Sequence, residues 1–132
     1  MTTPPADLRA QLDATYPAYL QAVVDRFTGA LALASFDGVL IHSGTSPEFF
    51  VDDHGYAFKV YAPFKVWAPL TDVPDCFIWF EPGKRPQLLL HQPADYWHKP
   101  AATPESYWPA HFGIHPLADP QAARAALPQD LR

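Results

Sequence analysis

The stretch that decides the fold of this chain runs Cys76-Phe-Ile-Trp-Phe80, Glu81-Pro-Gly-Lys-Arg-Pro86, Gln87-Leu-Leu-Leu90. Its first and last segments are short and rich in aliphatic and aromatic residues, which is typical of β-strands. The middle segment contains two prolines and a glycine, which favour a turn. The stretch therefore predicts two strands joined as a β-hairpin with a long loop.

Upstream of the hairpin, apolar residues recur every three or four positions, and this period predicts an amphipathic helix. They are Leu8, Leu12, Tyr16, Leu20, Val23, Val24, Phe27 and Leu31. Pro17 interrupts the pattern, and proline fits the first turn of a helix but not its interior. We therefore expect a short helix over about 6–14 and a longer one over about 17–34. A turn at Asp37-Gly38 and a buried strand at Val39-Leu-Ile41 follow.

Two proline-containing regions flank the hairpin at a greater distance. Residues 42–72 show only weak alternation, which Pro63 and Pro69 break, so an irregular and partly extended chain is expected there. Residues 91–110 carry four further prolines and predict a loop with up to one helical turn.

The C-terminal part of the chain adds a strand and a helix. Residues 112–114 predict a fourth strand, and residues 119–127 predict a helix with Asp119 as N-cap and Pro120 at its first position. The resulting order is helix, strand, hairpin, strand, helix. This order predicts an α/β fold with a mixed β-sheet flanked by helices.

Size, charge and cysteine content limit the classes of protein to which the chain can belong. Its 132 residues are 48% hydrophobic, which is typical of one domain, residues 1–132, with a buried core. A net charge of −5 and the lack of a basic patch disfavour nucleic acid and membrane surfaces as partners. No apolar run approaches a membrane span and no secretory signal is apparent. Cys76 is the only cysteine, so we expect a cytoplasmic protein without an internal disulfide.

The stretch Phe50-Val-Asp-Asp-His54 places two carboxylates and a histidine side by side. Hard cations bind carboxylate oxygens and imidazole binds zinc or manganese, so a metal site is one hypothesis. Neighbours in sequence rarely all point the same way, and no Glu or His at helical spacing completes the ligand set. A solvated turn with a capping Asp and a substrate-side or interface role are the alternatives.

A looser group of titratable residues follows the hairpin. Its members are His91, Asp95, His98, His111 and His115. On a helix, His111 and His115 would share one face, but Gly113 and Pro116 disfavour a helix at that point. Loop histidines that donate to backbone carbonyls are the favoured interpretation over a metal site.

Patterns for nucleophilic catalysis and for nucleotide binding are missing. Ser43-Gly44 lacks the preceding glycine of a nucleophile elbow, and no phosphate-binding glycine loop is present. Aromatic residues make up 14% of the chain, a share that either fills a core or stacks on a ligand. A binding module for proline-rich peptides or sugars through Trp67, Trp97 and Trp108 is therefore one alternative function.

Six motifs occur in the order seen near the N-terminus of bacterial Xaa-Pro dipeptidases, and over about 17–127 the chain resembles these prolidases and the similar organophosphorus acid anhydrolases. The motifs are Leu40-Ile-His-Ser-Gly44, Phe50-Val-Asp-Asp-His54, Phe58-Lys-Val60, Phe64-Lys-Val-Trp-Ala-Pro69, Val73-Pro-Asp-Cys76 and Pro93-Ala-Asp-Tyr-Trp-His98. The resemblance implies a creatinase-type N-terminal domain with a ribonuclease H-like motif. Relatives usually continue with a further strand and helix, so a sheet truncated at its C-terminal edge is expected.

The resemblance also implies a parent protein with two domains. A C-terminal pita-bread metallopeptidase domain would hold two divalent metal ions, usually manganese, and hydrolyse Xaa-Pro dipeptides. None of its metal ligands lies in this N-terminal region, so this chain is expected to carry no catalytic residue, no metal and no cofactor. Its expected partners are a second copy in a homodimer and the catalytic domain.

In this family, the second Asp of the Asp-Asp pair reaches into the active site of the other subunit, and this residue corresponds to Asp53. His54 and Trp67 match neighbouring family positions. Gly55 replaces a bulkier residue that is common after the histidine, which would loosen the loop. A competing hypothesis is an independent small metallohydrolase that uses Asp52, Asp53, His54, His91 and His98.

Overall fold

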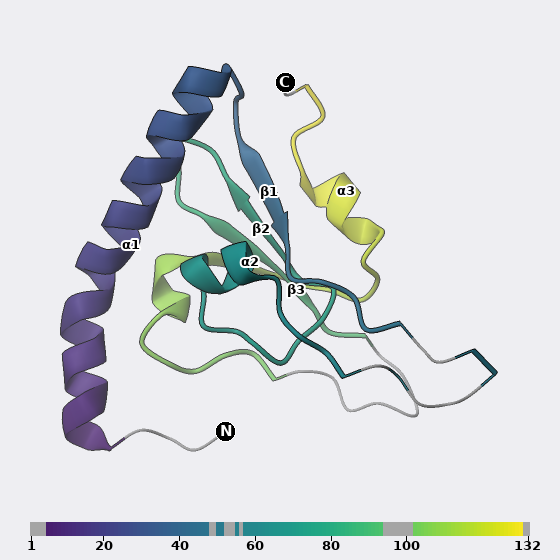
Figure 1. Ribbon diagram of the computed structural model, residues 1–132, viewed down its shortest axis with the longest axis horizontal. Coiled ribbons are helices and arrows are strands. Elements are labelled where there is room, and N and C mark those ends of the chain that lie inside the picture. The colour runs from purple at the N-terminus through teal and green to yellow at the C-terminus, as the bar shows by residue number, and fades with distance from the viewer. Residues whose placement is uncertain (1–4, 48–49, 52–54, 56, 94–101, 131–132) are drawn as a thin grey trace.

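The computed structural model describes residues 5–47, 50–51, 55, 57–93 and 102–130. Helices and strands are interspersed along the chain, with β2 and β3 following one another directly (Figure 1). They are α1 (Ala6–Ala34), β1 (Val39–His42), α2 (Ala62–Trp67), β2 (Phe77–Phe80), β3 (Gln87–His91), a 3-10 turn η1 (Pro109–His111), β4 (Gly113–Leu117) and α3 (Ala122–Ala126). None of the described helices combines the length and the apolar character that crossing a bilayer requires.

The four strands form one sheet in the order β1-β2-β3-β4. β1 and β2 pair antiparallel, as do β2 and β3, whereas β3 and β4 run parallel, so the sheet is mixed. In register, Ile41 lies opposite Ile78, Ile78 opposite Leu88, and Leu88 opposite Ile114. The predicted α/β class, the hairpin and all four strands are confirmed, while the ribonuclease H-like motif stays a prediction.

Both faces of the sheet are covered by helix. α1 and α2 lie over one face and α3 over the other (Figure 1). Ile78, Phe80, Leu88 and Leu90 point into the larger core under α1 and α2, while Leu89 packs with Leu117 and Ala123 under α3. β3 is therefore buried on both faces, which explains its uninterrupted run of leucines.

α1 is one continuous helix, and the predicted break at Pro17 is wrong. Tyr16, Leu20, Val23 and Leu31 form a single buried stripe that passes the proline. Burying one such side chain contributes about 1.5–3 kcal/mol, whereas an interior proline costs about 3 kcal/mol. The packing of the stripe therefore outweighs the hydrogen bond that Pro17 removes.

The expectation of irregular chain over residues 42–72 is wrong for α2. Pro63 lies in the first turn of this helix, where proline needs no N–H donor. Phe64 and Trp67 lie one turn apart and are both fully buried. Pro63 thus begins a helix that packs two aromatic rings on the sheet.

Two smaller expectations need correction. β1 lies at an edge of the sheet and is only partly buried: Ile41 points into the larger core, whereas Leu40, on the opposite face, is 42% exposed. The final helix is shorter than predicted: Asp119 accepts the Gln121 N–H at 2.9 Å, but this bond belongs to a turn that precedes Ala122–Ala126. The helical turn expected within residues 91–110 is present as η1.

Candidate functional site

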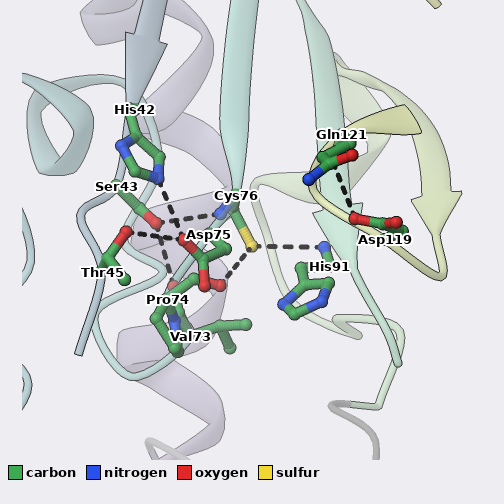
Figure 2. A network of polar contacts seen from close by, with 10 residues as sticks. All are labelled: His42, Ser43, Thr45, Val73, Pro74, Asp75, Cys76, His91, Asp119 and Gln121. Atoms are coloured by element: carbon green, nitrogen blue, oxygen red, sulfur yellow. Dashed lines mark hydrogen bonds and ion pairs between the residues drawn. The ribbon is translucent and has the colours of Figure 1, made fainter. Parts of the chain in front are cut away.

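A cluster of polar contacts lies where β1 ends and β2 begins (Figure 2). We call His42, Ser43, Thr45, Asp75 and Cys76 the neck cluster. Because β1 and β2 are antiparallel with His42 opposite Phe77, the end of one strand and the start of the other lie side by side. After β1 the chain forms a long loop that begins at Gly44 and comes back to Ser43 at Tyr61.

Ser43 is the buried centre of this cluster. Its hydroxyl donates to the Val73 carbonyl at 3.1 Å and accepts the Cys76 N–H at 3.0 Å. Its backbone N–H donates to the Cys76 carbonyl at 2.9 Å, and its own carbonyl accepts the Tyr61 N–H at 2.8 Å. With these partners the cost of burying a polar side chain is offset, and Ser43 joins three separate segments.

Asp75 forms the solvent-facing side of the cluster. One carboxylate oxygen accepts the Thr45 hydroxyl at 2.7 Å and lies 3.3 Å from Nε2 of His42. The Asp75 backbone N–H donates to the Gly44 carbonyl at 2.8 Å. Asp75 has a φ of 58°, the left-handed region in which Asp and Asn are tolerated better than other side chains.

The neck cluster is not arranged for nucleophilic catalysis. A catalytic serine donates its hydroxyl proton to a histidine, but the Ser43 hydroxyl donates to a backbone carbonyl. Burial raises the pKa of Cys76 to about 11, so little thiolate is present at neutral pH. The cluster is therefore suited to holding chain segments together.

The Ser43 to Tyr61 hydrogen bond closes the base of the loop formed by residues 44–60. The described part of this loop extends away from the sheet (Figure 1). Phe50 and Val51 within it are 97% and 87% exposed, so their apolar side chains are free of contact with the core. Asp53 and His54 lie outside the described residues, and their role stays a prediction.

Gly55 carries the departure from the family pattern that predicted a looser loop. A Cβ built at this position would lie 3.4 Å from Oγ of Ser46 and 3.7 Å from the carbonyl oxygen of Pro47. These are ordinary contact distances. The backbone at Gly55 has therefore room for a larger residue.

Trp67 lies in the core, with no exposed surface. Its ring centroid is 4.9 Å from that of Phe27 and 5.0 Å from that of Phe80, and its carbonyl accepts the Tyr16 hydroxyl at 2.7 Å. Its indole N–H has no hydrogen-bond partner among the described residues. The predicted contribution of Trp67 to a partner's pocket stays untested, and in this chain the side chain packs α2 against the sheet.

The remaining candidate residues do not gather into a site within the described ranges. His91 ends β3, His111 lies in η1, and His115 lies in β4, where its Nε2 is 2.6 Å from Oε1 of Gln87. The absence of a helix joining His111 to His115 is confirmed. No three His, Cys, Asp or Glu side chains that could hold a metal ion lie together in the part of the chain that is described.

Trp108, like Trp67, is buried, which disfavours the peptide-binding or sugar-binding alternative. Its ring packs edge-on against Phe112, with 5.7 Å between the ring centroids. Asp52, Asp95, Trp97 and His98 lie outside the described residues. Sequence reasoning missed the neck cluster, although two of its motifs contain every member except Thr45, because the contact between these motifs depends on the pairing of β1 with β2.

Comparison with known proteins gives a consistent result. A family model described as "Xaa-Pro dipeptidase, N-terminal domain" matches residues 14–132. An Xaa-Pro dipeptidase of Stenotrophomonas maltophilia (strain R551-3) is 44% identical over 117 residues, which cover 89% of this chain and 26% of that protein. The Xaa-Pro dipeptidase of Pectobacterium atrosepticum is 39% identical over 118 residues, with 89% and 27% covered. The chain thus spans about a quarter of the length of the curated relatives that it matches.

Proposed function

Because the chain belongs to the family of N-terminal domains of Xaa-Pro dipeptidases, we propose that it is the non-catalytic N-terminal domain of such an enzyme. In the full-length protein it contributes to a homodimer and covers the active site of the partner subunit. A C-terminal catalytic domain hydrolyses the Xaa-Pro dipeptide. Asp53, with His54, is this domain's contribution to the partner's pocket, whereas Trp67 is buried and holds α2 against the sheet.

The observation that supports this proposal is the closed base of loop 44–60. Ser43 and Tyr61 hold its two ends together, while Phe50 and Val51 are turned to solvent. A loop with a fixed base and exposed apolar residues is suited to reaching another surface. A carboxylate at Asp53 would there accept a charge-assisted hydrogen bond from the free amino group of a dipeptide.

We place the metal centre of the enzyme outside this chain. This inference rests on the family resemblance, which implies that the metal ligands belong to the catalytic domain. Among the described residues no three side chains that fit a metal ion lie together, while Asp52, Asp53, His54 and His98 lie outside those residues. In the catalytic domain, two divalent ions, with manganese as our expectation, would lower the pKa of a bound water and polarise the substrate carbonyl.

The test uses a full-length protein in which this chain replaces the matching N-terminal quarter of the Stenotrophomonas maltophilia relative. We expect Asp53→Ala to raise KM for an Xaa-Pro dipeptide by about 10- to 100-fold, because a charge-assisted hydrogen bond is lost. The metal content should stay unchanged. Steady-state kinetics and elemental analysis measure both quantities.

Asp52→Ala is the matched control, because it removes a neighbouring carboxylate from the same loop. The proposal requires its KM to stay much closer to that of the unmodified protein. Unchanged kinetics of Asp53→Ala, or an equal effect of both substitutions, would refute the assignment of Asp53.

A further inference from the structure

Three links connect Asp75 to the segment that leaves β1. Its carboxylate accepts the Thr45 hydroxyl at 2.7 Å and faces the His42 ring at 3.3 Å, and its N–H donates to the Gly44 carbonyl at 2.8 Å. Figure 2 shows His42 and Thr45 converging on the Asp75 carboxylate from two sides. A single residue thus fixes the direction in which the chain departs from the strand.

The contacts of Asp75 differ in environment from those of Ser43. Ser43 is fully buried and shares hydrogen bonds with Cys76 and Val73, so the fold depends on it. The side chains of Asp75 and His42 are 22% and 41% exposed, and ion pairs with that much exposure contribute little to overall stability. The Asp75 contacts are therefore more important for local geometry than for folding.

The backbone at this point also favours a specific residue. Asp75 is in the left-handed region at φ 58°, and Gly44, which accepts its N–H, has a φ of 115°. A positive φ is readily adopted by glycine and is better tolerated by Asp than by most other side chains. The backbone where loop 44–60 begins therefore suits the residues found at these two positions.

We propose that Asp75 is a positioning residue: by holding Thr45 and His42, it sets the direction of loop 44–60 and so the affinity of the partner's active site for substrate. This inference rests on the proposed function of the loop. Asp75 itself touches no substrate and acts through the loop that carries Asp53. The predicted effect therefore falls on KM and not on the chemical step.

Thr45→Val in the full-length chimera is the most direct test, because it removes one hydroxyl and keeps the shape of an exposed side chain. We expect KM to rise by about two- to tenfold, as for the loss of one hydrogen bond, with kcat and the melting temperature unchanged. Asp75→Gly keeps the left-handed backbone, removes the contacts to both Thr45 and His42, and should raise KM at least as much as Thr45→Val. Asp75→Asn keeps an acceptor oxygen and should stay near the unmodified KM.

A double substitution separates this inference from the proposed function. In an Asp53→Ala background, Thr45→Val should have no further effect on KM, because both act through the same contact. Full additivity would overturn the positioning role while leaving Asp53 in place. An Asp53→Ala variant without effect would instead refute the proposed function.

Hydrogen exchange on this chain provides a readout that does not depend on enzymatic activity. Thr45→Val and Asp75→Gly should accelerate amide exchange within residues 44–60 and leave β2 and β3 protected. Ser43→Ala is the structural control, and it should lower the melting temperature and loosen the sheet as well. Unchanged exchange in loop 44–60 of both Thr45→Val and Asp75→Gly would overturn the inference.

Discussion

The side chain of Cys76 is fully buried. Its sulfur accepts the His91 N–H at 3.5 Å and lies 3.7 Å from the Pro74 carbonyl oxygen. Desolvation by burial raises the pKa of the thiol from 9.0 to about 11. The His91 N–H opposes that shift, and the carboxylates of Asp75 and Asp72 add to it. The folded chain therefore keeps its proton on this thiol to a higher pH than the unfolded chain does.

This difference predicts a loss of stability in alkaline solution. Since the folded pKa is raised, the contribution of Cys76 is fully present below about pH 9 and is lost as the pH rises through about 11. A shift of this size corresponds to about 2–3 kcal/mol. Urea unfolding at pH 8 and pH 11 should show this loss, and Cys76→Ala, which has no thiol, should lose less over the same interval.

The raised pKa of Tyr16 also lowers stability in alkaline solution, so the comparison with Cys76→Ala is essential. Burial raises the pKa of the Tyr16 hydroxyl far above its ordinary value, and the charges of Tyr107 and Tyr19 would raise it further. Both variants contain Tyr16, so its contribution cancels in the difference. An equal loss of stability in both proteins would contradict the assignment to Cys76.

Among the elements, α1 and α2 are joined by two tyrosine hydroxyls. Tyr16 donates to the Trp67 carbonyl at 2.7 Å, and Tyr19 donates to the Val66 carbonyl at 2.6 Å. The last carbonyls of a helix have no partner within the helix. The long helix therefore satisfies the C-terminal end of the short one and fixes α2 over the sheet.

The continuity of α1 predicts that Pro17 costs stability. Pro17→Ala restores a backbone N–H toward the Asp13 carbonyl and removes the clash of the proline ring with that group. Pro17 is exposed, so no packing is lost, and we expect the free energy of unfolding to rise by about 2 kcal/mol. Urea unfolding followed by circular dichroism measures the change.

Ala14→Pro serves as the control, since it places a new proline at another exposed position in the same helix and should lower the free energy of unfolding by about 3 kcal/mol. A drop in stability for Pro17→Ala would mean that α1 requires a local bend at this residue.

The two prolines also show what local sequence patterns can predict. The strands and the hairpin were predictable because their apolar runs and turn residues lie close together in sequence. The local pattern predicts a break at both Pro17 and Pro63, although Pro17 lies inside α1 and Pro63 lies in the first turn of α2. Packing against the sheet decides both cases, and a local pattern contains no information on that packing.

The site was predictable only in part for the same reason. Asp53 and His54 were singled out through the family resemblance and stay predictions. Asp75 contacts Thr45 and His42 across 30 and 33 positions of sequence, and these contacts depend on strand pairing. A pattern within either segment therefore could not reveal that they form one cluster.

At the scale of the whole molecule, the sheet has two covered faces and two edges. The larger core lies under α1 and α2, the smaller one under α3, and β1 and β4 form the edges. Leu40 on β1 is partly exposed at one of them. Edges and exposed loops are where such a domain can contact further protein. Under the proposed function, such a domain would support a site that other chain segments complete.

That arrangement predicts that this chain alone does not hydrolyse dipeptides. Incubated with manganese and Ala-Pro, it should release no proline, and elemental analysis should find no stoichiometric metal, because under the proposed function the metal ligands belong to the catalytic domain. The full-length chimera under the same conditions should release proline. Hydrolysis that copurifies with the chain and is lost in His54→Ala would instead favour an independent metallohydrolase. In that case His54 would be needed to bind the metal and not to cover a partner's pocket.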